Sequence, residues 1–110
     1  IPTYNRPSSL NRTLESLDNQ TYEKDFICLI SDNNSSEETK KIVDYWTKRD
    51  TKFEIQYYKQ KNNLLPVDNW EFLIQKSTTK YTKIICRIIN TTEIFNIKFA
   101  NLILLIPFVQ

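Results

Sequence analysis

The first seven residues, Ile-Pro-Thr-Tyr-Asn-Arg-Pro, combine an aromatic ring, an amide and a cation just ahead of an expected helix. Tyr4 can stack on a flat ring, Arg6 can form charge-assisted hydrogen bonds, and backbone N–H groups at a helix start can face an anion. Together these groups suit the base and phosphates of a nucleotide. An ordinary surface turn covered by a tyrosine explains the same residues, and the chemistry alone favours that simpler interpretation.

A second polar segment, residues 30–39, places a carboxylate and two amides directly after an apolar run. Asp32 or Asn33 can hydrogen-bond a pyrimidine or a ribose. Asp and Asn also end strands and cap helices for purely local reasons. Binding and capping are therefore equally good interpretations of this segment when it is taken alone.

The periodicity of apolar residues predicts the elements that position these segments. Leucines at helical spacing follow Pro7, and short apolar runs between polar clusters indicate buried strands. Ser35 stands three residues before Glu38, the spacing of a capping box, so a helix should begin near Ser36. The patterns predict helices over 7–19, 36–49 and from residue 66 onward, strands over 26–30, 53–57 and 83–89, and a first strand ending at Ile1.

This order alternates strands with helices along the chain. Such alternation implies a mostly parallel sheet with helices on both faces, a Rossmann-like α/β fold. Sheets of this kind bind ligands outside the carboxyl ends of their strands. Residues 2–6 and 31–36 should therefore meet at one edge of the sheet and form the functional site.

Length and composition limit the classes of protein to consider. The chain has 110 residues, enough for one domain but not for two, and its net charge of +2 does not favour nucleic acid as a partner. Cys28 and Cys86 lie far apart in apolar runs and there is no His, so we expect buried free thiols and no zinc site, as suits a cytoplasmic protein. The chain has no Gly, so its turns must use Asn, Asp, Ser or Pro.

Several motifs stand in a familiar order along residues 1–86. The opening turn is followed by a helix ending in Asn-Gln-Thr-Tyr at 19–22, then by a strand that runs into Asp32 and a Ser-x-x-x-Thr pattern at 35–39. Asn-Asn-Leu at 62–64, Val-Asp-Asn-Trp at 67–70 and the run 81–85 come next. In these motifs the chain resembles family 2 glycosyltransferases, which have a GT-A type fold.

The resemblance implies roles for residues of both polar segments. The nucleotide-binding residues it implies are Pro2, Thr3 and Tyr4 around the nucleobase, Asp32 and Asn33 on uracil and ribose, and Arg6 on the turn or a phosphate. Asn33 stands where the family more often has a second Asp. An amide can both donate and accept hydrogen bonds, so specificity for one nucleobase stays open.

The resemblance also implies a divalent metal, Mg²⁺ or Mn²⁺, held by clustered acids after the strand that ends near Cys86. This chain reads Arg-Ile-Ile-Asn-Thr-Thr-Glu over 87–93 instead. A lone Glu93 cannot supply the oxygen ligands that such an ion needs beside a departing diphosphate. Arg87 is better explained as a solvated strand-end side chain than as a replacement cation. We therefore expect no metal site, and we assign no catalytic residue because the family's base would lie beyond residue 110.

The resemblance divides the chain into two parts. Residues 1–90 correspond to the nucleotide-sugar-binding half of a glycosyltransferase domain, and residues 91–110 form an apolar tail. The tail loses the family pattern, which a frameshift or gene-end artefact would explain; a divergent core helix or strand is the less favoured alternative. Its apolar run is shorter than the roughly 20 apolar residues that a helix needs to span a bilayer. We expect the chain to be a truncated fragment.

The expected activity of full-length relatives is sugar transfer from a nucleotide-diphosphate donor, of the UDP type, to a carbohydrate or lipid-linked acceptor. This chain would carry only the donor-nucleotide half. Its location would be cytoplasmic, at the inner membrane face for a lipid-linked acceptor. The alternative is a catalytically inactive nucleotide-binding or structural remnant. A nucleotide-binding module unrelated to sugars fits less well, because no Gly-rich phosphate loop is present.

Overall fold

A parallel three-stranded sheet alternates with helices along the chain. The computed structural model describes residues 1–21, 25–85 and 103–106. Its elements are β1 (Pro2–Thr3), α1 (Pro7–Asn19), β2 (Phe26–Asp32), α2 (Glu37–Thr47), β3 (Phe53–Lys59), α3 (Pro66–Lys76), β4 (Thr82–Ile85) and β5 (Ile103–Ile106). The predicted α/β fold class is confirmed, in an incomplete Rossmann-like form.

The central strand of the sheet is β2, with β1 and β3 on either side. In this register Pro2 lies opposite Ser31, and Asp32 lies opposite Lys59. Because the strands are parallel, the loops that follow β1, β2 and β3 all leave the same edge. β4 is paired in parallel with β5 in a separate two-stranded sheet, where Thr82 lies opposite Ile103.

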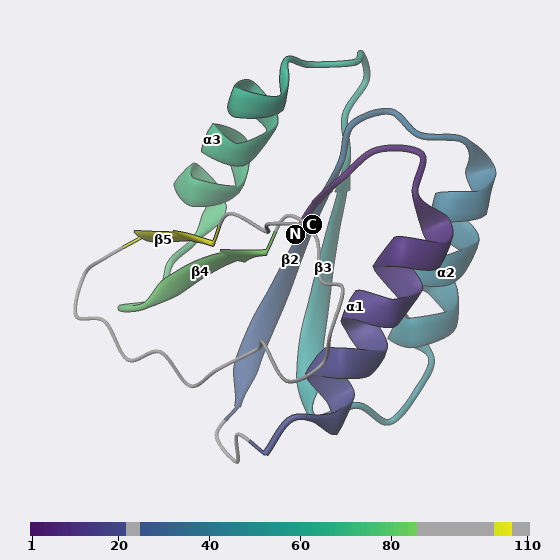
Figure 1. Ribbon diagram of the computed structural model, residues 1–110, viewed down its shortest axis with the longest axis vertical. Helices are drawn as coiled ribbons and strands as arrows, with labels where there is room; N and C mark the ends of the chain where they lie inside the picture. Colours follow the sequence, from purple (N-terminus) through teal and green to yellow (C-terminus); the bar gives the residue numbers. More distant parts are fainter. Residues whose placement is uncertain (22–24, 86–102, 107–110) are drawn as a thin grey trace.

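Helices cover both faces of the sheet formed by β1, β2 and β3 (Figure 1). α1 and α2 lie side by side on one face, and α3 packs against β1 and β2 from the other. The chain steps from β1 to β2 to β3 in one direction, so right-handed crossovers place α1 and α2 on the same face. The prediction that helices cover both faces of the sheet is confirmed.

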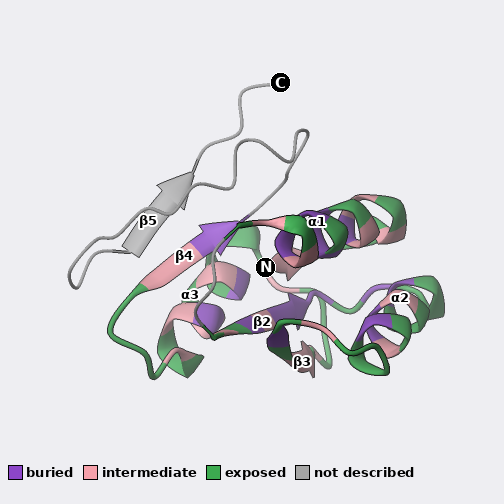
Figure 2. Ribbon diagram, turned by 90° about the horizontal axis from the view of Figure 1, so that it is seen from below, coloured by how far each residue is buried: buried purple, intermediate pink, exposed green. Residues whose placement is uncertain are grey.

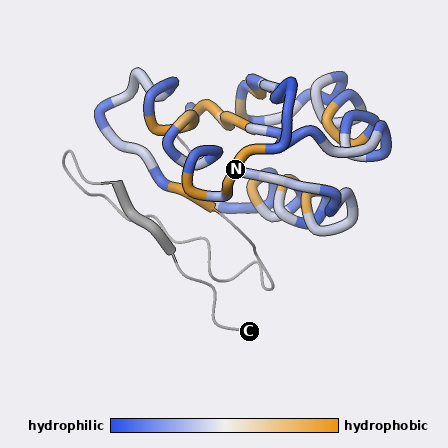
Figure 3. Tube along the Cα trace, turned by 90° about the horizontal axis from the view of Figure 1, so that it is seen from above, coloured by the Kyte–Doolittle hydropathy of each residue, from blue (hydrophilic) through white to orange (hydrophobic). Residues whose placement is uncertain are grey.

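The core lies between β2 and the inner faces of α1 and α2. Its buried side chains are Leu10, Leu14, Leu17, Cys28, Ile30, Val43, Trp46, Phe53 and Ile85. Figure 2 shows buried positions on β2, at the end of β4 and on the helix faces turned toward the sheet. Hydropathy follows the same division, because the helices carry hydrophobic stripes inside and hydrophilic residues outside (Figure 3). Burial of each large aliphatic side chain contributes about 1.5–3 kcal/mol to this packing.

The turns use Asn where other proteins use Gly. Asn5 and Asn34 have φ angles of 46° and 60°, in the left-handed region that is costly for most residues but less so for Asn. Asn5 follows β1 and Asn34 follows β2. The expectation that Asn supplies turns in this glycine-free chain is confirmed at both positions, and both lie at the carboxyl edge of the sheet.

The predicted capping box at the start of α2 is wrong. Ser36 is the N-cap residue of that helix and makes no side-chain cap bond. The Ser35 hydroxyl instead accepts a hydrogen bond from the backbone N–H of Asn5, and Glu38 forms an ion pair with Lys41. A tertiary partner thus takes the hydroxyl that the local pattern assigned to the helix.

Other differences concern where elements end. α2 begins at Glu37 and ends at Thr47, two residues before the predicted end, and the first strand is Pro2–Thr3 and does not end at Ile1. β4 covers the first part of the predicted strand 83–89, and the remainder of that prediction lies outside the described residues. Cys28 is the buried free thiol that was expected, whereas Cys86 also lies outside them. Within the described ranges, no helix is long and apolar enough to cross a membrane.

Candidate functional site

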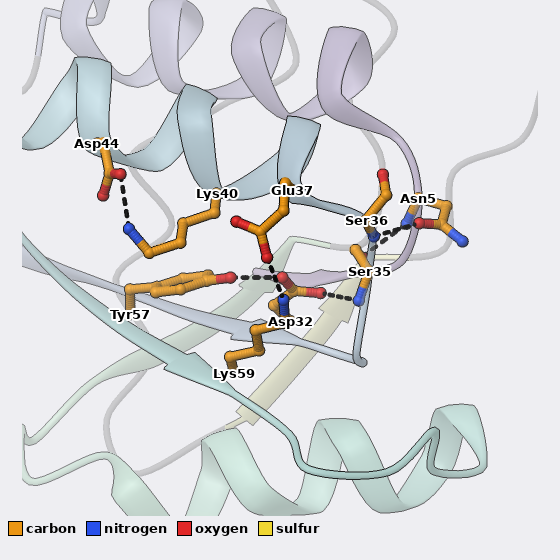
Figure 4. A network of polar contacts seen from close by, with 9 residues as sticks. All are labelled: Asn5, Asp32, Ser35, Ser36, Glu37, Lys40, Asp44, Tyr57 and Lys59. Carbon is orange, nitrogen blue, oxygen red and sulfur yellow. Dashed lines mark hydrogen bonds and ion pairs between the residues drawn. The ribbon is translucent and has the colours of Figure 1, made fainter.

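The loops that follow β1 and β2 are joined directly at the carboxyl edge of the sheet (Figure 4). The backbone N–H of Asn5 donates to the Ser35 hydroxyl at 2.8 Å, and the Asn5 side-chain oxygen accepts from the backbone N–H of Ser36 at 2.9 Å. A third bond runs from the Asn33 N–H to the Thr3 carbonyl oxygen, 2.9 Å away. The left-handed turn at Asn5 allows its backbone and side chain to face the same loop. The two polar segments therefore meet at one edge of the sheet, as the parallel topology predicts.

Asp32 lies at the centre of this site and is fully buried, with 0% of its surface exposed. Its Oδ1 atom accepts from the Ser35 N–H at 2.8 Å, and its Oδ2 atom accepts from the Tyr57 hydroxyl at 2.5 Å (Figure 4). Burial, followed by the hydrogen bond to Asp32, raises the pKa of Tyr57, so the phenol keeps its proton and acts as a donor. In this structure the Asp32 carboxylate organises the loop, and both of its oxygens are engaged within the protein.

Asn33 is also buried, and its side chain is bonded to a third loop. The amide nitrogen donates to the Leu64 carbonyl oxygen at 2.8 Å, and the amide oxygen accepts from the Leu64 N–H at 2.6 Å. The Asn63 side chain donates to the Asn33 carbonyl oxygen at 3.1 Å. The loop between β3 and α3 is thereby held against the end of β2.

The residues of the first loop are more open. Tyr4 has 49% of its surface exposed, and Arg6 is exposed as well, directly before the first residue of α1. Pro2 and Thr3 are half-buried beside them. An exposed ring and an exposed guanidinium next to a helix N-terminus can bind a base and a phosphate without any rearrangement of the core.

A buried polar network supports the site from the α3 side. The Ser31 hydroxyl donates to the Asn69 side-chain oxygen at 2.5 Å and accepts from the Gln60 amide at 3.0 Å. Asn69 also donates to the Ser31 carbonyl oxygen. The sequence placed Asn69 in a motif and Ser31 in the polar segment 31–36, but it did not predict the bond between them, and Gln60 was not predicted as a site residue. The signal for a partner of Ser31 was its hydroxyl next to an apolar strand, since such a group needs a partner when it is buried.

Charged side chains surround the edge of the site. Lys59, at the end of β3, forms an ion pair with Glu37 at the start of α2, with 3.2 Å between nitrogen and oxygen (Figure 4). Lys40 and Asp44 form a second pair along α2. These pairs are partly or well exposed, so each adds little to stability. Tyr57 and Lys59 were not predicted as site residues, because the register that brings β3 against Asp32 is a tertiary property.

The described residues offer little for a divalent metal. Among residues 1–21, 25–85 and 103–106, no three His, Cys, Asp or Glu side chains are grouped so that they could hold an ion. Asp32 is the acid at the centre of the site, and it already accepts two hydrogen bonds. Arg87 and Glu93 lie outside the described residues.

Comparison with known proteins gives one family and two curated relatives. Residues 1–86 match the family described as Glycosyl transferase family 2. The chain is 37% identical over 81 residues to the GalNAc(5)-diNAcBac-PP-undecaprenol beta-1,3-glucosyltransferase of Campylobacter jejuni, an alignment that covers 66% of this chain and 26% of that protein. It is 38% identical over 71 residues to the abequosyltransferase RfbV of Salmonella typhimurium, which covers 64% of this chain and 21% of that protein.

The chain thus spans about a quarter of the length of these relatives. No solved structure matches it. The family match covers both loops of the candidate site, the strands that carry them and the loop 60–65.

Proposed function

This chain belongs to glycosyltransferase family 2, and on that premise we propose that its candidate site binds the nucleotide of a nucleotide-diphosphate sugar. The observation that carries the proposal is the set of three hydrogen bonds joining the loops after β1 and β2. They bring an exposed aromatic ring and an exposed cation to the same edge of the sheet as the buried end of β2. Ligands of open α/β sheets bind at that edge.

Each residue has a distinct part in this proposal. Tyr4 stacks on the base, Pro2 and Thr3 form the adjoining wall, and Arg6 together with the first N–H groups of α1 holds a phosphate. Asn33 reads the polar edge of the base. Asp32 contributes to nucleoside binding by holding the loop in place, since its own oxygens are bonded to Ser35 and Tyr57.

The complete reaction would be carried out by the full-length protein. Both relatives are named as glycosyltransferases, and the name of the Campylobacter protein includes a polyprenyl diphosphate-linked saccharide. We propose that the full-length protein transfers a sugar from a UDP-type donor to a carbohydrate or lipid-linked acceptor, and that this chain supplies the donor-nucleotide half. We assign the catalytic base of that reaction to the acceptor half of the full-length protein and to no residue of this chain.

A second candidate is a nucleotide-binding protein without transferase activity. The observation in its favour is the sequence over 87–93, which has a single acid, Glu93, where the family's clustered acids would stand. The two candidates differ in turnover, because both predict nucleotide binding. Release of free sugar or transfer from a UDP-sugar in the presence of Mn²⁺ would rule out the inactive candidate.

Titration calorimetry with UDP tests the binding proposal directly. We expect saturable heat with UDP, and loss of that heat when Tyr4 is replaced by Ala. ADP serves as the comparison ligand, because it has the same diphosphate and a different base. Circular dichroism verifies that each sample is folded. Folded protein that gives no heat with UDP would refute nucleotide binding at this site.

A further inference from the structure

Asn33 occupies the position from which a nucleobase would be read, yet its amide is already bonded to the chain itself. The Leu64 N–H donates to its Oδ1 atom at 2.6 Å, and its Nδ2 atom donates to the Leu64 carbonyl oxygen at 2.8 Å. Only 5% of the Asn33 surface is exposed. Both hydrogen-bonding functions of the amide are therefore engaged by one residue.

The N–H and the carbonyl oxygen of Leu64 present the same donor and acceptor as the edge of a pyrimidine base. A pyrimidine such as uracil carries an N–H donor beside a carbonyl acceptor, and an amide can pair with both at once. Leu64 offers one N–H and one carbonyl oxygen to the same amide. A base that pairs with both atoms at once needs the same edge of the Asn33 amide as Leu64, because the second N–H and the second lone pair point away from that edge. Leu64 and such a base therefore compete for Asn33.

We propose that the loop 60–65 closes the nucleobase position of Asn33 in the free protein and must move away when a nucleotide binds. The proposal rests on the proposed nucleotide-binding function. It goes beyond that function because it assigns the loop a regulatory part, as an internal competitor of the base.

The loop is built so that its middle can move while its ends stay fixed. At the first end, Gln60 donates its backbone N–H to the Asp32 carbonyl oxygen at 2.8 Å and its side-chain amide to Ser31. At the other end, the Leu65 carbonyl oxygen accepts from the N–H groups of Asp68 and Asn69 in α3. Both anchors are independent of Asn33.

Little packing holds the middle of the loop in place. Residues 61–63 are exposed, and Leu65 has 67% of its surface exposed. What holds the middle is the Asn33 pair on Leu64 and the bond from Asn63 to the Asn33 carbonyl oxygen. These three hydrogen bonds, each contributing a factor of about three, favour the closed loop by about thirtyfold, and apparent nucleotide affinity is lowered by the same factor.

Asn33→Asp separates the two uses of this position. Aspartate has no donor for the Leu64 carbonyl oxygen and would set a negative oxygen against it. The loop should open, while the carboxylate can still accept from the N–H of a base. We expect Asn33→Asp to bind UDP about tenfold more tightly than the unaltered chain.

A second variant, Asn63→Ala, leaves the Asn33 side chain intact and removes only the bond to the Asn33 carbonyl oxygen. It should bind UDP about threefold more tightly. Asn62→Ala is the matched control, because its exposed side chain takes no part in these bonds.

Hydrogen exchange at the Leu64 amide provides a measurement that does not depend on any variant. We expect this N–H to be protected in the free chain and to exchange faster when UDP is saturating. If UDP binds while the Leu64 amide stays equally protected, loop closure is refuted and nucleotide binding stands. If neither the folded unaltered chain nor folded Asn33→Asp binds UDP, the proposed function fails and the closure proposal fails with it. Binding by Asn33→Asp alone would support closure, since only the open loop then admits the nucleotide.

Discussion

The Tyr57 hydroxyl donates to Oδ2 of the buried Asp32 across 2.5 Å, and so joins β3 to the end of β2 beneath the candidate site. The other oxygen of the same carboxylate accepts from the Ser35 N–H. A buried carboxylate needs such donors, because loss of one leaves a charged oxygen without compensation for its lost hydration. Tyr57 is thus one of two donors that offset the lost hydration of Asp32, together with the Ser35 N–H.

Tyr57→Phe should therefore lower the free energy of unfolding by about 2 kcal/mol, as expected for a bond to a charged, buried acceptor. Urea unfolding followed by circular dichroism measures this change. Tyr58→Phe is the matched control, since the Tyr58 hydroxyl donates to the neutral Gln56 side chain at 3.2 Å. That control should lose less than about 1 kcal/mol. Equal losses in the two variants would contradict a special role for the Asp32 bond.

The hydrogen bonds between the two site loops predict different losses of stability at two neighbouring serines. Ser35→Ala removes the acceptor of the Asn5 N–H and should cost about 1 kcal/mol of stability together with affinity for UDP. Ser36→Ala should change stability by no more than about 0.5 kcal/mol, because the Ser36 side chain makes no cap bond although it precedes α2. Chemical denaturation and calorimetry of both variants provide the comparison. A larger loss at Ser36 than at Ser35 would contradict this assignment, because it would show that the Ser36 hydroxyl contributes more than the bond between Asn5 and Ser35.

If Tyr4 stacks on the base, the affinity for UDP depends on the aromatic ring of Tyr4 and not on its hydroxyl. Tyr4→Ala should weaken UDP binding by about 1–3 kcal/mol, whereas Tyr4→Phe should bind nearly as well as tyrosine. Tyr45→Ala is the control, because Tyr45 has a similar exposed fraction of 54% but lies on α2, about 12 Å along the helix from its first residue. Titration calorimetry measures all three. An unchanged affinity in Tyr4→Ala would remove Tyr4 from the site.

The buried thiol of Cys28 predicts how stability depends on pH. Burial raises its pKa from 9.0 to about 11. Between these values the unfolded chain loses the thiol proton while the folded chain keeps it, so a rising pH favours unfolding. This residue should lower the free energy of unfolding by about 1.4 kcal/mol per pH unit across that window and by almost nothing at lower pH.

Cys28→Ala provides the reference for that measurement. Other groups titrate in both proteins, so the difference between the two unfolding free energies isolates the thiol. We expect the difference to be constant up to about pH 8 and then to fall toward about pH 11. Two curves that stay parallel over the whole range would show that the thiol is not held in its neutral form by the fold.

Much of the framework could be predicted from the sequence because it depends on local patterns. Apolar spacing after Pro7 and Pro66 predicted α1 and α3, and alternation of strands with helices predicted a parallel sheet. Parallel strands send their carboxyl ends to one edge, so the meeting of residues 2–6 with residues 31–36 followed without coordinates. The absence of Gly likewise indicated Asn turns, which occur at Asn5 and Asn34.

Only the tertiary structure decided which atoms pair within the site. The local pattern assigned Ser35 to a helix cap, but its hydroxyl accepts from Asn5, 30 residues away. Asp32 and Asn33 were equally suited to capping and to binding, and the fold brings Tyr57 to one and Leu64 to the other. The physical reason is that a polar side chain bonds whichever donor or acceptor packing places within reach. The spacing of residues along the chain determines the elements, whereas the register and packing of β2 against β3 and the loop 60–65 determine those partners.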